Sequence, residues 1–299
     1  MQMWKYCTVL IKYHKIIITA TLAAVTGILL FAILEKTVGE MTVAYLDVGQ
    51  GDSIFIADGA NEKILIDGGP GRQVLRSLAK EMGKFDRTLN VVVATHSDSD
   101  HVGGILEVCE NYKIENFLYN GYDAGKDYMV SVLECMKNQN TNIQVIGMGG
   151  SIEFTSGGIL KFLSPSQLDL SQINPEDNNS SSIVSVLEYG NHKFMFMADA
   201  PKKLEDNILE VYKSEISNSI TVLKVGHHGS DTSSGETFLS VIKPTYSVIS
   251  VGKDNKYGHP KESVIQTLEK YSKYILSTEL SGNIKFMTDG RLINVTLEK

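Results

Sequence analysis

The sequence predicts an α/β fold in which layered β-sheets are covered by helices, preceded by one apolar helix. Three observations support this. From residue 41 onward, short β-rich runs alternate with segments of helical period, the early runs are spaced as hairpins, and the later run NVVVA at 90–94 is apolar throughout, as in a buried strand. No internal repeat or Pro/Ser-rich linker divides this part, so residues 41–299 are predicted to form one domain.

The apolar helix is predicted at residues 16–34, which are uncharged and mostly apolar. At about 1.5 Å per residue this run nearly matches a hydrocarbon layer of ~30 Å. Lys5, Lys12 and Lys15 precede it, so residues 1–15 are expected in the cytoplasm and the domain outside, as a single-pass membrane protein with an extracytoplasmic catalytic domain. A cleaved signal peptide and a buried core helix are the alternatives.

The remaining elements are expected in alternating order along the domain. Strands are expected at 42–47, 53–58, 63–66, 90–94, 114–119, 143–146, 159–163, 182–187, 193–197, 220–225, 246–251 and 284–288. Helices are expected near 72–84, 104–111, 126–137, 202–213, 236–242 and 261–273.

Charge and cysteine content limit the functional classes. The net charge is −7, and because the first 34 residues hold three lysines and no carboxylate, the remaining 265 carry −10. An acidic body argues against broad binding to nucleic acid, although metal ions can hold such a substrate locally. A Cys109–Cys135 bridge is compatible with an oxidising compartment, and two unpaired buried thiols are the alternative.

The most informative segment is VVVATHSDSDHVGG at 91–104, where an apolar strand ends in a polar cluster. The cluster holds His96, Asp98, Asp100 and His101, and the glycine pair after it is predicted to open the next helix. Two imidazoles and two carboxylates delivered by one rigid strand end suit a pair of metal ions a few ångströms apart. The alternative is a solvated polar turn.

Two further strand ends carry groups of the same kind. TVLKVGHHGSDTSS at 221–234 places His227 and His228 after an apolar strand, where one imidazole can complete a metal site and the other can face a substrate oxyanion. Asp199 follows the strand at 193–197 and is either a bridging metal ligand or the N-cap of the next helix.

These motifs together resemble the metallo-β-lactamase superfamily, through ILIDGG, the HxDxDH run, Asp199 and HHGS. More closely, AYLDVGQGDSIFI, THSDSDHVGG, LKVGHHGSDTSS and NKYGHP resemble the extracellular hydrolase domain of the ComEC competence family, over about residues 41–290. That family also has a multi-pass channel region and often an oligonucleotide-binding barrel. Neither is predicted here, so transport is not expected of this chain.

The resemblance implies a metallo-β-lactamase-like αββα four-layer sandwich with two divalent metal ions at one sheet edge. It places His96 and Asp98 on the first ion and Asp100 and His101 on the second. Because Asp98 stands where the wider superfamily has a histidine, manganese joins zinc as a candidate.

It also implies that Asp199 bridges the ions and that His227 or His228 completes the second. Two departures from the superfamily pattern accompany this. The stretch Asn178-Asn179-Ser180 stands in place of the middle histidine, and Ala198 replaces the glycine before the bridging aspartate.

Catalytic and substrate-binding roles are predicted around this centre. Asp100 and His259 are the catalytic candidates, His259 as a group that grips phosphate or protonates a leaving oxygen, with a plain helix-entry loop as the alternative. The predicted substrate contacts are His227, Lys253, Asn255 and Asn179. Asp67 and the acids of the DVGQGD turn at 47–52 are expected to support the ligands.

The predicted function is that of a membrane-anchored, outward-facing, metal-dependent hydrolase of phosphoesters, a phosphodiesterase or nuclease. Its partners would be a phosphodiester substrate, DNA first among them, and the membrane through residues 16–34; no protein partner is predicted. One alternative is a small-molecule or phosphocholine-type phosphodiesterase. Another is a non-catalytic module of a DNA-uptake or envelope assembly, and a β-lactam hydrolase is the least supported.

Overall fold

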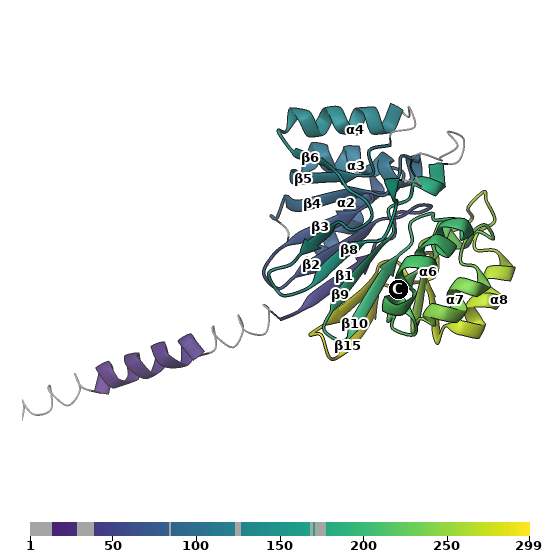
Figure 1. Cartoon of the computed structure of the whole chain (residues 1–299). Helices are drawn as coiled ribbons and strands as arrows, with labels where there is room; N and C mark the ends of the chain where they lie inside the picture. Colours follow the sequence, from purple (N-terminus) through teal and green to yellow (C-terminus); the bar gives the residue numbers. More distant parts are fainter. Residues whose placement is uncertain (1–13, 29–38, 84, 123–126, 168–169, 171–177) are drawn as a thin grey trace, which may run out of the picture.

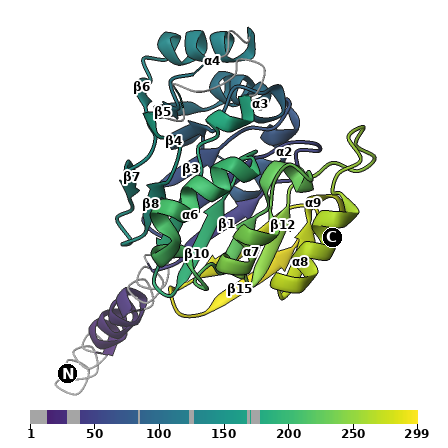
Figure 2. The same ribbon diagram turned by 45° about the vertical axis from the view of Figure 1, so that its right-hand side comes forward.

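The computed structural model describes residues 14–28, 39–83, 85–122, 127–167, 170 and 178–299. Within them, two β-sheets lie face to face and helices cover their outer faces, so the predicted four-layer αββα sandwich is confirmed (Figures 1 and 2). The early hairpins are also confirmed, since β1 (Met41–Tyr45), β2 (Ile54–Asp58) and β3 (Lys63–Ile66) pair antiparallel in succession.

The first sheet has the strand order β15-β14-β1-β2-β3-β4-β5-β6. Its parallel part joins β3 to β4 (Thr88–Ala94), β5 (Lys113–Tyr119) and β6 (Asn142–Val145), while β14 (Ile284–Thr288) and β15 (Ile293–Leu297) extend the other side antiparallel. Helices α2 (Gln73–Glu81), α3 (Ser99–Asn111) and α4 (Asp127–Asn138) cover its outer face.

The second sheet has the order β13-β12-β11-β10-β9-β8-β7. Its antiparallel strands are β7 (Ser151–Glu153), β8 (Ile159–Phe162), β9 (Ser185–Tyr189) and β10 (His192–Phe196). Strands β11 (Val222–Lys224), β12 (Tyr246–Ile249) and β13 (Tyr274–Ser277) continue parallel to β10. Helices α6 (Lys202–Ile216), α7 (Glu236–Ile242) and α8 (Glu262–Tyr271) cover this sheet, and α9 (Thr278–Ser281) follows β13 (Figure 2).

Alternation along the strands separates three apolar cores: one between the two sheets, and one under the helices that cover each sheet. On β1, Val43 and Tyr45 face the second sheet, whereas Ala44 packs under the helices of the first. The aromatic contact between Tyr45 and Phe196, with ring centroids 6.2 Å apart, joins the two sheets. Burial of apolar side chains on both faces explains why the central strands read as continuous apolar runs.

The glycine pair at 103–104 has a role other than the predicted one. Helix α3 begins at Ser99, five residues before the predicted start, so Asp100 and His101 lie in its first turn. A Cβ at Gly104 would lie 2.0 Å from the carbonyl oxygen of Gly68, and one at Gly103 would lie 2.5 Å from that of Pro70. The glycines therefore allow α3 to pack against the loop after β3, and the prediction that they open the helix is wrong.

Three strands were not predicted: β7, β13 and β15. β7 and β15 are edge strands whose residues are mostly exposed, so they lack the alternation of apolar residues that identifies a half-buried strand. β13 follows α8 after two residues, too few for a visible break in the pattern.

The N-terminal apolar segment is helical over residues 14–28, and this helix stands away from the body in both views (Figures 1 and 2). Among the described residues, no helix combines the length and apolar character that crossing a bilayer requires. Residues 29–34 of the predicted span and residues 1–13 of the predicted cytoplasmic tail lie outside the described residues.

Candidate metal centre

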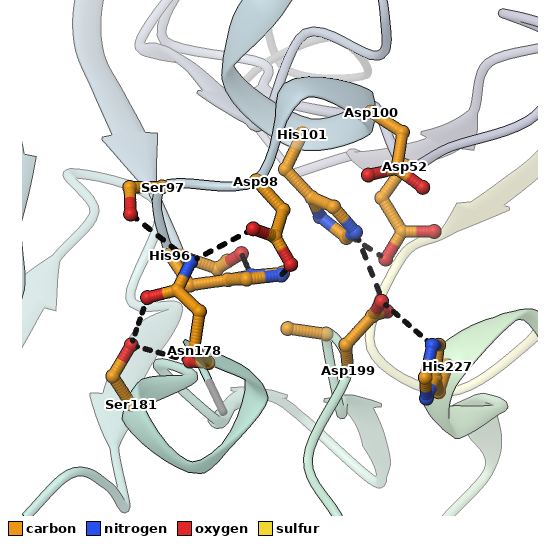
Figure 3. A network of polar contacts seen from close by, with 12 residues as sticks. Asp52, His96, Ser97, Asp98, Asp100, His101, Asn178, Ser181, Asp199 and His227 are labelled. Carbon is orange, nitrogen blue, oxygen red and sulfur yellow. Dashed lines mark hydrogen bonds and ion pairs between the residues drawn. The ribbon is translucent and has the colours of Figure 1, made fainter. Parts of the chain in front are cut away.

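The candidate site lies where the parallel strands of both sheets end. His96 follows β4, Asp199 follows β10, and His228 follows β11, so three strand ends deliver side chains to one rim. Figure 3 shows His96 after β4, His101 on α3 and Asp199 after β10 directed toward one another. In α/β sheets, ligands commonly bind just beyond the carboxyl ends of the strands, where loops from neighbouring strands bring their side chains together.

His101 is held in one orientation by a buried carboxylate. Its Nδ1 lies 2.8 Å from Asp67 Oδ2, and Asp67 also accepts hydrogen bonds from the backbone and hydroxyl of Thr95 at 2.8 and 2.6 Å. This leaves His101 Nε2 facing Asp199 Oδ1 at 3.3 Å. The supporting role predicted for Asp67 thus agrees with its contacts.

His228 is also held through its Nδ1, in this case by a backbone carbonyl oxygen. Its Nδ1 lies 2.9 Å from the carbonyl oxygen of Ser250, and its Nε2 lies 3.5 Å from both Asp100 Oδ2 and Asp199 Oδ2. His227 differs, because its Nδ1 lies 3.0 Å from Thr232 Oγ1 and its ring is one-quarter exposed, with Nε2 3.6 Å from Asp199 Oδ2. The geometry therefore places His228 inside the cluster and His227 on its open side.

His96 and Asp98 form the other end of the cluster. His96 is fully buried, with Nε2 3.6 Å from Asp98 Oδ2. Asp98 is the N-cap residue of α3 but makes no side-chain capping bond there, and Asn178 Nδ2 donates to its Oδ1 at 3.1 Å and to Ser97 Oγ at 3.0 Å (Figure 3). Asn178 therefore lies beside the cluster and holds the carboxylate of Asp98 by a hydrogen bond.

Asp199 does not cap a helix. Helix α6 begins after Pro201, whose position has no side-chain cap, so the N-cap alternative is wrong. Ala198 adopts a left-handed conformation with φ 46°, and its carbonyl oxygen accepts hydrogen bonds from the backbone of His227 and from Lys224 Nζ, both at 3.0 Å. These bonds hold the backbone of Ala198 and thereby direct Asp199 into the site.

Lys224 is a fully buried cation that no sequence motif indicated. It forms an ion pair with Asp52 Oδ2, and its Nζ lies 3.9 Å from Asp199 Oδ1. The sequence does place Lys224 at the end of a short strand that is otherwise apolar. A lysine buried in this way needs a carboxylate partner, so its position could have indicated an ion pair near the site. Because Asp52 pairs with Lys224, it supports the site from below the cluster of His and Asp side chains.

Burial and charge shift several pKa values in the site. Burial disfavours the charged forms, but the carboxylates of Asp199 and Asp52 outweigh it at His228 and raise its pKa to about 9. In Asp199, burial is likewise opposed by the charges of His228 and His101, which hold its pKa well below the ordinary value. Burial lowers the pKa of His227, and burial together with the charge of His227 lowers that of His259.

The residues present fit a pair of metal ions. In the part of the chain that the structure describes, six buried imidazole or carboxylate atoms have no hydrogen-bond partner: His96 Nε2, His101 Nε2, His228 Nε2, His259 Nδ1, Asp52 Oδ1 and Asp199 Oδ1. Four overlapping groups of the described residues have ligand atoms within 4.8 Å of one another: His96, His101 and Asp199; Asp100, His101 and His228; Asp52, Asp67 and His101; and Asp52, Asp199 and His228. Buried unsatisfied imidazole nitrogens beside carboxylates are the arrangement expected of a divalent metal site.

A pocket of about 150 Å³ opens beside these atoms. The residues that line it are Gln50, Asp98, Asp100, Asp199, His227, His228, Tyr257 and His259. Three predicted substrate contacts, Asn179, Lys253 and Asn255, are not among the described residues that line the pocket. Both amide hydrogens of Asn255 donate to backbone oxygens of Gly252 and His259, so Asn255 shapes the loop that presents His259.

Comparisons with known proteins agree with the fold and the resemblance. Residues 46–127 match a family model described as the metallo-beta-lactamase superfamily. ComE operon protein 3 of Bacillus subtilis is 29% identical over 272 residues, which are 85% of this chain and 34% of that protein. Competence protein ComA of Neisseria gonorrhoeae is 30% identical over 249 residues, 83% of this chain and 32% of that protein. The chain thus spans about a third of the length of these relatives.

Solved structures share the fold at low sequence identity. The metallo-beta-lactamase fold protein YhfI of Bacillus subtilis superimposes with a TM-score of 0.53 at 9% identity, covering 83% of this chain and 100% of that one. Zn²⁺-bound PqqB of Methylobacterium extorquens gives 0.52 at 12% identity, covering 76% and 85%.

Proposed function

We propose that this metallo-β-lactamase domain, which is similar to part of the ComEC-type competence proteins, is a metal-dependent hydrolase of phosphodiesters. The observation that carries the proposal is the convergence of buried imidazole and carboxylate atoms without hydrogen-bond partners beside an open pocket. In this proposal His96 and Asp98 would hold one ion and Asp100, His101 and His228 would hold another, with Asp199 contributing to both; zinc and manganese are the candidates. Such ions supply hydroxide at neutral pH and neutralise the charge of phosphoryl transfer.

The chain's own groups bind and orient the substrate in this proposal. His227 lies on the open side of the cluster and His259 lines the pocket 5.8 Å from it, measured between ring centroids. The lowered pKa of His259 keeps its ring neutral at neutral pH. A phosphoryl anion beside the ring would raise this pKa, which is the condition under which His259 can protonate a leaving oxygen.

The test is hydrolysis of a chromogenic phosphodiester, bis(p-nitrophenyl) phosphate, by the purified full chain with Mn²⁺ or Zn²⁺. Asp100→Asn is expected to lower the rate to less than about 1% of the wild type, because it removes a charged ligand from the cluster. His192→Asn is the matched control, since His192 is a half-buried histidine outside the site that contacts the backbone of Arg291. Equal rates for Asp100→Asn and the wild type would defeat the assignment.

The size of the diester is a separate part of the proposal. The charge of −10 on the body argues for small substrates, whereas the loop at 253–261 supports a nucleic acid, because the half-exposed ring of Tyr257 lines the pocket and Lys256 Nζ lies 5.1 Å from the centroid of that ring. We favour single-stranded DNA, since a local basic and aromatic rim is sufficient once metal ions hold the scissile phosphate. Cleavage of a labelled oligonucleotide slower than that of the small diester would reverse this choice.

We further propose that residues 16–34 anchor the domain outside the cytoplasmic membrane, with residues 41–299 as one hydrolase domain. The exposed apolar side chains of helix 14–28, among them Ile17, Ile18 and Leu22, support a lipid environment. The Cys109–Cys135 disulfide supports an oxidising compartment, and Cys7 is the remaining cysteine of the sequence.

Cys7 provides the test of this topology. A membrane-impermeant maleimide is expected to leave Cys7 unlabelled in intact cells and to label it after permeabilisation. Labelling in intact cells would contradict the orientation, and a mature protein that lacks Cys7 would show that the segment is a cleaved signal peptide.

A further inference from the structure

The turn between β1 and β2, residues 46–53, is wedged between the two halves of the site. Gly51 has φ 134°, and a Cβ there would lie 2.1 Å from the carbonyl oxygen of Asp100. On the other side of the turn, a Cβ at Gly252 would lie 2.5 Å from the backbone nitrogen of Gln50. The backbone of Gln50 is therefore fixed between the start of α3 and the loop that follows β12.

The side chain of Gln50 is fixed as well, and one end of it is free. Its Oε1 accepts a hydrogen bond from the backbone nitrogen of Gly252 at 3.3 Å. A flipped amide would place two donors against each other there, so this contact sets the orientation. The other end, Nε2, is buried and has no hydrogen-bond partner among the described residues, and Gln50 lines the pocket with Asp100, His228 and His259.

A buried amide donor without a partner costs about 1–3 kcal/mol, so an acceptor is expected in the pocket when the protein works. An Nε2–H group can only donate. A donor aimed at the attacking hydroxide would make that group less nucleophilic, whereas a donor aimed at a phosphoryl oxygen stabilises charge that grows in the transition state. A pocket of about 150 Å³ has room for one phosphoryl group.

We infer that Gln50 is a catalytic residue whose Nε2 donates a hydrogen bond to a non-bridging oxygen of the phosphoryl group in the pocket. This inference rests on the proposed hydrolase function and assigns to the β1–β2 turn a part of the substrate site. No bond is made or broken by Gln50, and its fixed amide needs no reorganisation when the substrate binds.

The experiment compares Gln50→Glu, Gln50→Met and the control Gln73→Glu in the full, Mn²⁺-loaded chain. Gln50→Glu keeps an oxygen for Gly252 and replaces only the donor, and Gln50→Met removes the amide without adding charge. Gln73 binds the backbone oxygen of Asp47 from the outer side of the same turn, at 3.2 Å, so its change alters the turn but not the pocket. Three quantities are measured: bound manganese, affinity for inorganic phosphate by calorimetry, and kcat on bis(p-nitrophenyl) phosphate.

Both Gln50 variants are expected to keep full manganese content, to bind phosphate at least about 10-fold more weakly, and to lose roughly 10²- to 10³-fold in kcat, the usual effect of removing one oxyanion donor. Gln73→Glu is expected to stay within about twofold of the wild type in all three quantities. Wild-type values of kcat and phosphate affinity in both Gln50 variants would overturn the inference. So would a loss of manganese that accounts for the loss of activity, because Gln50 would then only support the ligands.

The two proposals fail separately. If the wild type hydrolyses no diester but binds phosphate in a Gln50-dependent way, the hydrolase proposal is wrong and the assigned contact stands. If the wild type hydrolyses the diester and both Gln50 variants match it, the contact is wrong and the hydrolase stands. If the wild type neither binds phosphate nor hydrolyses the diester, both are wrong.

Discussion

Lys224 and Asp52 form an ion pair at the base of the site in which both side chains are buried. Removing one partner of a buried pair leaves the other charge without compensation, which is strongly destabilising even though the pair itself adds little net stability. Without Lys224, the carboxylate of Asp52 would lie close to that of Asp199 with no lysine between them. The repulsion would then act on Asp199, which is proposed to hold metal.

Lys224→Met is therefore expected to lower the free energy of unfolding by about 3–5 kcal/mol. The measurement is urea unfolding of the metal-free protein at pH 7. Lys161→Met serves as the control, because Lys161 pairs with Glu188 on the surface and such pairs contribute at most about 1 kcal/mol. Equal losses in the two variants would show that burial of Lys224 does not matter.

Glu205 is a buried acid that binds the end of the segment 226–235, which carries His227 and His228. Both of its oxygens accept backbone hydrogen bonds, one from Ser234 and one from Gly235. Burial, partly opposed by these bonds, raises its pKa from the ordinary 4.5 to about 7. The folded protein thus binds this proton more tightly than the unfolded chain, so the contribution to stability is complete below pH 4.5 and is lost as the pH rises to about 7.

The expected contribution is on the order of 3 kcal/mol across that range. Glu205→Gln cannot ionise and should lose less stability than the wild type between pH 4.5 and 7. Urea unfolding at a series of pH values measures the difference, with Asp206→Asn, an exposed acid of the same helix, as the control. Parallel curves for the wild type and Glu205→Gln would contradict the raised pKa.

At the scale of elements, the position of α3 determines where Asp100 and His101 point. The helix lies against the loop after β3 through Gly103 and Gly104, and backbone bonds from Gly68 to His101 and from Gly104 to Gly69 join the two segments. A side chain at Gly104 would push α3 away from this loop and so displace the first turn of the helix, which carries the two proposed ligands.

Gly104→Ala is expected to lower the free energy of unfolding by at least about 2 kcal/mol, because its Cβ would lie 2.0 Å from a backbone oxygen that cannot move freely. It is also expected to weaken Mn²⁺ binding measured by calorimetry. Gly71→Ala is the matched control on the same loop, since a Cβ there meets nothing within 4 Å. A stable Gly104→Ala variant with normal metal affinity would show that α3 is free to shift.

At the scale of the whole molecule, the proposed metal centre joins the two halves of the sandwich. His96, Asp98, Asp100 and His101 come from the half with the first sheet, while Asp199 and His228 come from the half with the second. An ion held by both halves in the folded state only must stabilise the whole fold.

Mn²⁺ at a free concentration of a hundred times its Kd is expected to add about 2.7 kcal/mol to the free energy of unfolding. The melting temperature should rise by roughly 5–10 °C for a domain of this size, and a chelator should reverse the rise. Asp199→Asn should abolish the effect, whereas Asp206→Asn should keep it. Scanning calorimetry provides the measurement, and a melting temperature independent of Mn²⁺ would contradict the centre.

The sequence by itself determined the layered α/β fold and most of its strands, because burial on both faces produces apolar runs that can be read directly. It also identified the polar residues at strand ends, since His96, His101, Asp199 and His228 stand out after such runs. Edge strands such as β7 escaped prediction because exposed residues carry no periodic signal.

Only the tertiary structure decided which of those residues meet, because contacts between the two sheets join positions far apart in the chain. It separated His228 from its neighbour His227, placed Asn178 against Asp98, and paired Lys224 with Asp52. Each of these depends on the direction of a side chain at a bend or strand end, where local sequence sets no periodicity and packing between distant elements fixes the orientation.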